Sequence, residues 1–563
     1  MTRLPVAVRP GIDGLLEDPS PIAGRAIGLI TNPSGVTARG VPSWKALAGA
    51  PGVRLVRLFG PEHGVDGGAI YMESVGDAVH PPTGLPVVSL YGDRLESLRP
   101  TAEHLSGLEA LVFDVQDVGA RYYTFVWTML LAMEASAEAG LRFVVCDRPN
   151  PIGGAAEGAA QDPDMLSFVG LHPIAVRHGM TAGELARLLA AERRIDVDLH
   201  VVPAAGWARN VPFERTGLPW VSPSPNIPAP RTALVYPGMC LLEGTNLSEG
   251  RGTTRPFELF GAPWIAAGRF AEALNGAGLA GVRFLPTHFR PMFDKHAGAT
   301  CGGALLEVTD AGAFHSFETG LRVVEIARRL APREFAWRTE PYEFDPRPAI
   351  DLLTGSRRFR ELLDAGGDVA PELARHAARG EAFLARREPF LLYADRRPAA
   401  VAFVGAHNSG KTTLLVDLVP RLTARGLAVG TLKHSSRDAA DDVEGKDSER
   451  HAAAGARVAG FVTPGRTTAR RFGPEEPLED LLAREFASCD LVLVEGYKAM
   501  PLPKIEVRRR GIGGPPVADP LARVSDEPGT DGVPTISFAE ENREALAETV
   551  LRLAGLSRGP RNR

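Results

Sequence analysis

The segment GAHNSGKT, residues 405–412, restricts the fold more than any other part of this 563-residue chain. It fits the pattern GxxxxGK[ST] and lies between an apolar run, 399–404, and a helical pattern that ends near residue 426. In this order of strand, glycine loop and helix, backbone N–H groups converge on phosphate oxygens, and the helix start adds its positive dipole end. Residues 399–563 are therefore predicted to form a separate P-loop NTPase α/β domain.

This loop and its neighbours supply a set of candidate nucleotide ligands. Lys411 is expected to reach the β- and γ-phosphates, while the Thr412 hydroxyl and Glu495, which ends the apolar run LVLVE, are expected to hold Mg²⁺. Lys433 and His434 end another expected strand, at the sheet edge where ligands bind. No NKxD motif is present, so the residues alone do not choose GTP over ATP. The predicted nucleotide-binding residues are Gly405, Asn408, Ser409, Gly410, Lys411, Thr412, Thr413, Lys433 and His434.

Residues 399–556 resemble molybdopterin-guanine dinucleotide biosynthesis protein B. The resemblance rests on five segments in the same order, GAHNSGKTTL, GTLKH, DSERHAAAGA, DLVLVEGYKAMPLPKIEV and VSDEP. It implies GTP binding with weak hydrolysis, and a supporting role when a guanylyl group is attached to the molybdenum cofactor. A guanylyltransferase of that cofactor is the implied partner. The alternative is an independent P-loop GTPase that serves no partner.

The first 204 residues alternate short apolar runs with helical stretches, which predicts a Rossmann-like parallel sheet domain. Most of the runs are apolar on both faces, as in a sheet covered by helices on each side. TFVWTMLLAMEASAEAG, residues 124–140, is an expected helix with Gly140 as its C-terminal glycine. The expected strands are AIGLIT (26–31), VRLVRLFG (53–60), LPVVSLYG (85–92), ALVFDV (110–115), RFVVCD (142–147) and DLHVVP (198–203).

From about residue 205 the pattern changes. The segment WVSPSPNIPAPRTALVYPG is rich in proline and predicts loops, and EGTNLSEGRGTTRPFE is crowded with glycine and polar residues. Mixed helical and extended patterns then continue to about residue 390. Residues 205–393 are therefore predicted to form a second, α+β lobe associated with residues 1–204.

Polar segments follow several of the expected strands, so they should meet at one edge of the parallel sheet. Glu62, in GPEHG, is a candidate general acid or base because partial burial would raise its pKa, and His63 is expected to orient it. Glu243 and Glu249, in EGTNLSEGRG, add two further candidate catalytic carboxylates. Paired carboxylates across a cleft are the usual equipment of glycoside hydrolysis. No GxGxxG follows the first expected strand, and neither a GxSxG nor an HExxH motif is present to compete with this interpretation.

Residues 5–393 resemble the exo-acting β-N-acetylmuramidase family of glycoside hydrolases. The matching segments are LITNPSG, FGPEHG, SLYG, LVFDVQDVGARYYT, DRPNPIGG, RHGMTAGELA, TGLPWVSPSPNIP, YPGMCLLEGTNLSEGRGTTRPFE and PYEFDPRPAIDLLTG. The resemblance implies release of terminal N-acetylmuramic acid from cell-wall fragments. The predicted substrate-binding residues, all from these segments, are Asn32, Asp114, Gln116, Asp117, Arg121, Tyr122, Arg148, Asn150, Arg177, His178, Asn226, Asn246 and Arg251.

The muramyl sugar carries a lactyl carboxylate, for which arginine is the natural partner. Arg121, Arg148, Arg177 and Arg251 are equivalent candidates at this point. The family pattern has phenylalanine and arginine after PEHG, where this chain has Val65 and Asp66. A basic residue is thus missing beside Glu62, and the alternative is a non-catalytic sugar-binding module.

The composition restricts the partners and the cellular compartment expected for this protein. The net charge of -5 is small for the length, so neither a nucleic-acid partner nor a membrane surface is expected. The four cysteines are scattered with no CxxC pair, and we find no signal peptide or apolar run long enough to span a bilayer. A cytoplasmic protein is therefore expected. Its wall substrate would be an imported fragment, as in peptidoglycan recycling.

Overall fold

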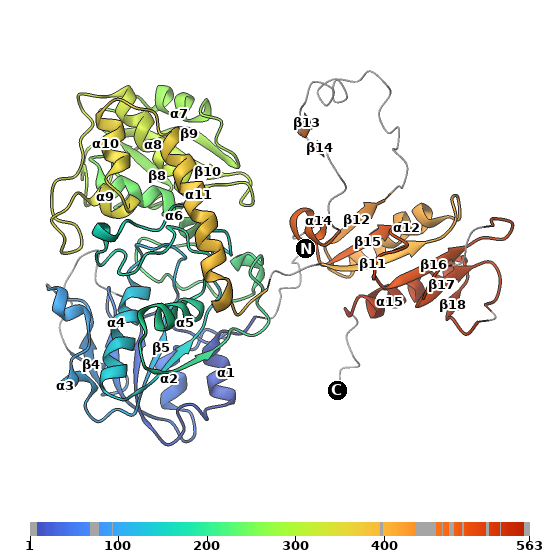
Figure 1. The fold of residues 1–563 in the computed structure, drawn as a ribbon, viewed down its shortest axis with the longest axis horizontal. Helices are drawn as coiled ribbons and strands as arrows, with labels where there is room; N and C mark the ends of the chain where they lie inside the picture. The colour runs from blue at the N-terminus through green and yellow to red at the C-terminus, as the bar shows by residue number, and fades with distance from the viewer. Residues whose placement is uncertain are drawn as a thin grey trace. The chain divides into compact units, whose positions relative to one another are not determined.

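The computed structural model describes residues 8–67, 78–92, 94–394, 398–434, 458–463, 466–471, 478–486, 489–513, 517–529 and 531–556. The chain divides into two compact units, one of residues 5–394 and one that contains residues 395–563 (Figure 1). The buried apolar clusters of the described residues each lie wholly within one unit. Each unit therefore has a hydrophobic core of its own.

A seven-stranded sheet in the order β3-β4-β2-β1-β5-β6-β7 forms the first lobe of the 5–394 unit. Its strands pair in parallel, except that β3 runs antiparallel to β4 at one edge. The predicted Rossmann-like parallel sheet is thus confirmed. The strands are β1 (Ala26–Thr31), β2 (Arg54–Gly60), β3 (Ala78–Val79), β4 (Pro86–Ser89), β5 (Ala110–Asp114), β6 (Arg142–Cys146) and β7 (Asp198–Val202).

Helices cover both faces of this sheet, because strand side chains alternate between two apolar clusters. Ala110 and Val112 of β5 pack with α1 and α2, whereas Leu111 and Phe113 pack with α4 and α5. Helix α4 ends as predicted, since Gly140 follows it with a φ of 67°. The helices of this lobe are α1 (Gly11–Glu17), α2 (Ser43–Ala48), α3 (Ala102–Leu105), α4 (Phe125–Glu138) and α5 (Ala182–Arg193), with short 3₁₀ turns at Leu95–Leu98, Pro163–Met165 and Phe213–Arg215.

The second lobe packs helices on a three-stranded antiparallel sheet of order β8-β10-β9. Its apolar residues continue the cluster of the first lobe, so Trp127 of α4 and Leu242 belong to the same core. The two lobes are therefore one folding unit. The elements are α6 (Pro230–Met239), η4 (Cys240–Gly244), β8 (Leu259–Ala262), α7 (Ala267–Asn275), β9 (Val282–Phe289), β10 (Cys301–Val308), α8 (Ser316–Leu330), α9 (Ala349–Thr354), α10 (Arg358–Asp364), α11 (Ala370–Arg387) and η5 (Glu388–Phe390).

The other unit contains a six-stranded, all-parallel sheet of order β12-β15-β11-β16-β17-β18. Helices α12 and α15 pack on one face and α14 on the other, which confirms the predicted P-loop α/β fold. Its elements are β11 (Ala399–Val404), α12 (Lys411–Ala424), β12 (Val429–Lys433), the hairpin β13 (Val458–Thr463) and β14 (Arg466–Arg471), α14 (Leu478–Glu485), β15 (Leu491–Glu495), β16 (Lys504–Arg508), β17 (Ala522–Ser525), β18 (Thr535–Ile536), η6 (Glu540–Asn542) and α15 (Arg543–Leu553). No helix among the described residues is both long and apolar enough to cross a bilayer.

The end of the 5–394 unit is fastened to the first lobe by two buried carboxyls. The Tyr393 hydroxyl donates to Asp147 at 2.6 Å, and the backbone N–H of Leu392 donates to Glu184 at 2.7 Å. Asp147 follows β6, and burial raises its pKa to about 6, although hydrogen bonds from Tyr393 and Thr181 oppose the rise. Removal of the tyrosine donor would leave a buried carboxylate with one partner fewer.

We expect Tyr393→Phe to destabilise this unit by about 1–3 kcal/mol near pH 7, the usual cost of removing a partner from a buried charged group. The folded state holds the Asp147 proton more tightly than the unfolded chain does, so stability falls as pH rises from about 4 to about 6. Because the tyrosine donor lowers that pKa, the variant should continue to lose stability above this range. Near pH 4, where Asp147 is protonated, the two proteins should differ less.

Urea unfolding followed by tryptophan fluorescence measures this directly, because all six tryptophans lie in this unit. Leu392→Ala, which shortens an exposed side chain beside Tyr393, is the matched control. Equal stability of Tyr393→Phe and the native chain at both pH values would contradict the assignment.

Candidate active site and phosphate-binding loop

A buried cavity between the two lobes of the first unit brings together residues that are far apart in the sequence. Its volume is about 30 Å³, which is room for one water-sized molecule. A sugar ring can therefore enter only when surrounding side chains move. Six predicted site residues line it, namely Glu62, His63, Tyr122, Asn226, Glu243 and Arg251. Eight more line it that were not among the predicted site residues: Tyr123, Thr124, Ser224, Ile227, Tyr236, Phe257, Tyr342 and Glu343.

Glu62 reaches the cavity from a tight turn after β2. The N–H of Gly64 bonds to the carbonyl of Pro61 at 2.8 Å, and His63 has a left-handed φ of 72°. Only a glycine fits at residue 60, because a Cβ there would lie 2.9 Å from the backbone nitrogen of Val65. The Thr124 hydroxyl, at the start of α4, donates to Glu62 Oε2 at 2.7 Å. This turn and this hydroxyl fix the carboxyl direction.

The two residues that depart from the family pattern lie outside the cavity lining. Val65 is buried in the apolar cluster beneath the sheet, with α1 and α2. Asp66 is exposed, with Oδ1 3.8 Å from Nε2 of His80. Neither Val65 nor Asp66 therefore contributes a side chain to the cavity wall.

Glu243 lies opposite, in the second lobe, and both of its oxygens are occupied. Arg251 donates to Oε1 at 2.7 Å, and the Tyr342 hydroxyl donates to Oε2 at 2.7 Å. Burial on its own raises the pKa of Glu243, but the Arg251 charge and these hydrogen bonds outweigh it and hold the pKa below its usual value. Glu249 does not line the cavity; it lies 3.4 Å from Arg251 and 3.0 Å from Lys295. It therefore positions Arg251.

Glu343 is a cavity carboxyl that the sequence did not single out. The Tyr91 hydroxyl donates to its Oε2 at 2.9 Å, and its backbone has a left-handed φ of 47°. Burial and the nearby charge of Glu62 raise the pKa of Glu343 well above its usual value. Glu343 lies in the family segment PYEFDPRPAIDLLTG, but residue type and spacing there do not mark a buried acid, because its environment depends on the distant Tyr91 and on the charge of Glu62.

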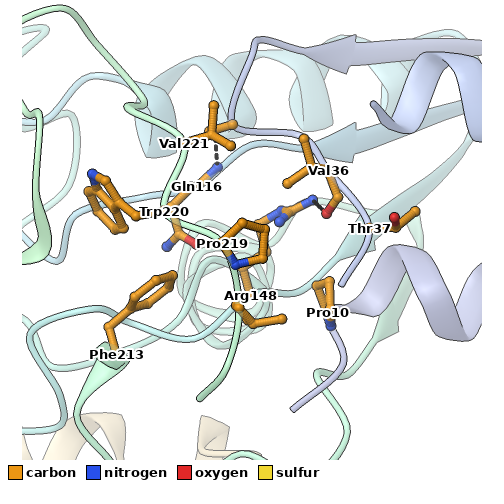
Figure 2. A pocket seen from close by; sticks show the side chains of 11 residues that line it. Pro10, Val36, Thr37, Gln116, Arg148, Phe213, Pro219, Trp220 and Val221 are labelled. Atoms are coloured by element: carbon orange, nitrogen blue, oxygen red, sulfur yellow. Dashed lines mark hydrogen bonds between the residues drawn. The ribbon is translucent and has the colours of Figure 1, made fainter. Parts of the chain in front are cut away.

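Two of the predicted residues beyond β5 and β6, Gln116 and Arg148, line a different, smaller pocket (Figure 2). Arg148 forks onto Asp114 at 2.7 and 2.8 Å, and Gln116 donates to the carbonyl of Pro149 at 2.9 Å. Asn32 donates to the carbonyl of Pro223 at 3.0 Å. Figure 2 shows the 219–221 segment over Gln116 and Arg148. The remaining volume is about 10 Å³, which leaves no room for a sugar.

Six further predicted residues stabilise loops and lie outside the cavity lining. Arg121 is fully buried, donates to backbone carbonyls such as that of Leu353 at 2.6 Å, and has a pKa lowered to about 10 by burial. The others have comparable contacts: Arg177 to Glu157 (2.6 Å), Asn150 to the Met180 carbonyl (2.9 Å), Asn246 to the Glu334 carbonyl (2.7 Å), the Gly119 N–H to Asp117 (2.7 Å), and the Met180 N–H to His178 (3.2 Å).

In the second unit the GAHNSGKT segment forms a loop between β11 and α12. Asn408 and Gly410 have positive φ values of 61° and 93°, which turn the backbone tightly ahead of the helix. Lys411 Nζ donates to the Ala406 carbonyl at 2.7 Å and lies 3.4 Å from the Ser409 hydroxyl. Burial lowers the pKa of Lys411. The lysine thus lies over its own loop, where phosphate oxygens would replace these carbonyl partners.

The predicted metal ligands lie on one side of this loop, because β15 is the neighbour of β11. The Thr412 hydroxyl donates to Glu495 Oε2 at 2.7 Å, and Lys433 Nζ lies 3.8 Å from Oε1. Two oxygen ligands this close together suit Mg²⁺. His434 stacks on Tyr497 with ring centroids 4.1 Å apart, and Thr413 is exposed.

A larger cavity of about 760 Å³ lies on the other side, at the ends of β16 and β17. Gly405 and Ala406 of the loop form part of its wall, together with Arg508, Arg509 and Arg510. Its volume is within the ordinary range for small-molecule pockets. A molecule whose phosphates lie on the loop has space there for its remaining part.

A carboxylate-lined cavity in one unit and a P-loop beside a large pocket in the other define a glycoside hydrolase joined to a P-loop nucleotide-binding domain. The family model described as "Exo-beta-N-acetylmuramidase NamZ, N-terminal" matches residues 27–231, and its C-terminal counterpart matches 234–393. The model for "Molybdopterin guanine dinucleotide synthesis protein B" matches residues 400–524.

Individual relatives agree with the family models. A peptidoglycan β-N-acetylmuramidase NamZ of Bacillus subtilis is 44% identical over 388 residues, 69% of this chain and 91% of that protein. A molybdopterin-guanine dinucleotide biosynthesis adapter protein of Haemophilus influenzae is 36% identical over 127 residues, 22% of this chain and 71% of that protein. The crystal structure of a DUF1343 family protein from Bacteroides fragilis, 35% identical, has a TM-score of 0.63 and covers 69% of this chain and 99% of its own. The chain belongs to the NamZ exo-β-N-acetylmuramidase family, and its C-terminal domain belongs to the MobB family.

Proposed function

We propose that the first unit releases terminal N-acetylmuramic acid from cell-wall fragments, with Glu62 as a reacting carboxylate and His63 orienting it. The observation that carries this proposal is the cavity in which Glu62 meets Glu243, Glu343 and Arg251. The names of the relatives support the sugar class. We place the reaction in the cytoplasm, on imported fragments, as a step of peptidoglycan recycling. The GTP proposed for the other unit is a cytoplasmic nucleotide.

Among the four candidate arginines, Arg251 is the one proposed to bind the lactyl carboxylate. Arg251 also pairs with a carboxylate, Glu243, but it lines the cavity, whereas Arg121, Arg148 and Arg177 do not. Its guanidinium lies 5.2 Å from the ring centroid of Phe257, which fixes its plane. A fixed guanidinium can bind a carboxylate with two parallel hydrogen bonds.

We expect Glu62→Gln to lower kcat on a muramyl glycoside by about 100- to 10,000-fold, the usual contribution of a positioned acid or base. Colorimetric assay of the full-length chain measures the loss. Asp66→Asn, an exposed acid on the same loop, is the matched control and should retain the native rate. A fully active Glu62→Gln enzyme would remove Glu62 from the mechanism. A native chain that binds but never cleaves the glycoside would indicate a sugar-binding module.

We expect Arg251→Gln to lower kcat/KM by about 10- to 100-fold on the muramyl glycoside, since a charged hydrogen bond contributes about 1.5–3 kcal/mol. On the matching N-acetylglucosaminyl glycoside, which lacks the lactyl group, the same variant should show a much smaller decrease in kcat/KM. Arg251→Lys keeps the positive charge but cannot form two parallel hydrogen bonds. Its kcat/KM on the muramyl glycoside should therefore lie between the values of the native chain and of Arg251→Gln. Equal losses on both glycosides would show that Arg251 acts on Glu243 rather than on the lactyl carboxylate.

For the second unit we propose that the P-loop binds GTP and Mg²⁺ in support of attaching a guanylyl group to the molybdenum cofactor. Thr412 and Glu495 would hold the Mg²⁺, which supplies positive charge beside the phosphates. The 760 Å³ cavity would receive the nucleoside. The relatives are named adapter proteins, which favours a role beside a guanylyltransferase over independent GTP hydrolysis.

We expect Lys411→Ala to weaken GTP·Mg²⁺ binding by at least about 10- to 100-fold, because it removes charged hydrogen bonds to phosphate. Isothermal titration of the full chain measures it. Arg552→Ala, which removes an exposed cation in the last turn of α15 and outside the pocket lining, removes the same charge and should bind normally. Undiminished binding by Lys411→Ala would refute the phosphate role. Slow GTP hydrolysis that an added guanylyltransferase leaves unchanged, with no complex formed, would contradict the adapter role.

A further inference from the structure

The cavity carboxyls differ in their partners, and the difference separates their chemistry. Arg251 and Tyr342 occupy both oxygens of Glu243. Among the described residues, by contrast, no lysine or arginine forms an ion pair with Glu343, whose recorded partner is the neutral Tyr91 hydroxyl at 2.9 Å. A carboxyl without a cation beside it has little reason to be charged.

We propose that Glu343 is the catalytic acid that delivers the proton to the oxygen leaving the muramyl sugar, with Glu62 as the base. This inference rests on the proposed glycosidase activity of the first unit. It assigns opposite tasks to two carboxyls that reach one cavity from different lobes, Glu62 after β2 and Glu343 before α9. The sequence alone suggested Glu62, Glu243 and Glu249 for such tasks.

The charges around Glu343 favour its protonated form. Burial is the largest influence and raises its pKa, and the negative charges of Glu62 and Glu243 act in the same direction. The hydrogen bond from Tyr91 and the charge of Arg251 act against it without reversing the result. Glu243 has its pKa lowered in the same cavity. A carboxyl that favours its protonated form in such a cavity is suited to donate a proton.

The backbone around Glu343 is held in an unusual conformation. Glu343 and Phe344 have successive positive φ values of 47° and 68°, which are costly for residues with a Cβ. The turn is closed by two backbone hydrogen bonds between Tyr342 and Asp345, at 2.8 and 3.0 Å. Such strain persists where the surroundings fix it, and it concentrates at functional sites. Here it places Tyr342 and Glu343 side by side on the cavity wall.

The proposed step balances as follows in atoms and electrons. The bond between the anomeric carbon and the glycosidic oxygen breaks, its electron pair goes to that oxygen, and the oxygen takes the proton of Glu343. One water adds its oxygen to the anomeric carbon and gives a proton to Glu62. Transfer of that proton from Glu62 to Glu343 restores the starting state, so one water is consumed for each bond cleaved.

The test compares leaving groups in the full-length chain. We expect Glu343→Gln to lower kcat/KM by about 100-fold or more on a muramyl disaccharide, whose leaving oxygen needs the proton. On a 2,4-dinitrophenyl muramyl glycoside, whose leaving group departs without protonation, kcat/KM of this variant should fall by less than about 10-fold. The basic limb of the pH–rate profile should also disappear. Equal losses on both substrates with the basic limb intact would overturn the proposal.

A second variant keeps the test decisive if Glu343→Gln fails to fold. Tyr91→Phe removes a hydrogen bond that lowers the pKa of Glu343, so the basic limb of the profile should move to higher pH. A basic limb that stays in place would contradict the assignment of Glu343. If the native chain hydrolyses neither substrate, the glycosidase proposal itself fails, which is a different result from either outcome above.

Discussion

The apolar core shared by the two lobes of the first unit is the constraint on which the rest of its chemistry depends. It runs from Phe113 in the parallel sheet through Trp127 in α4 to Leu242 and Ile350 in the second lobe. Since interiors pack as densely as organic crystals, this core fixes the lobes against each other. Glu62 from one lobe and Glu343 from the other can then share a cavity that neither lobe could form alone.

Much of the fold could be predicted from the sequence, because its signals are local. Each apolar run expected as a strand in residues 1–204 is a strand, and Gly140 ends α4 with a positive φ. The P-loop also carries its own geometry, in Asn408 and Gly410. The position of the cavity could not be predicted in this way. Parallel-sheet folds direct attention to the ends of β1 and β5, but the side chains of Asp114 and Arg148 and the 219–221 segment fill that place.

The roles of the site residues could not be predicted from local sequence either. Arg121, Arg148, Arg177 and Arg251 stand in similar motifs, and only their partners distinguish them: backbone carbonyls, Asp114, Glu157 and the cavity carboxylate Glu243. Glu343 escaped notice because its properties come from long-range packing against Tyr91 and Glu62. Burial and charge environment are tertiary properties, so residue type and spacing could suggest a carboxylate mechanism but not the carboxyl that stays protonated.

The small volume of the cavity between the lobes has a consequence for ligand affinity. Its free space of about 30 Å³ is smaller than a sugar ring, so a sugar bound inside it displaces wall residues. Part of every binding free energy measured at this site is thus absorbed by rearrangement of the protein. The measured affinity will therefore be lower than the contacts of the bound sugar alone would give. A substitution that makes the wall residues easier to displace would strengthen binding even if it does not contact the ligand.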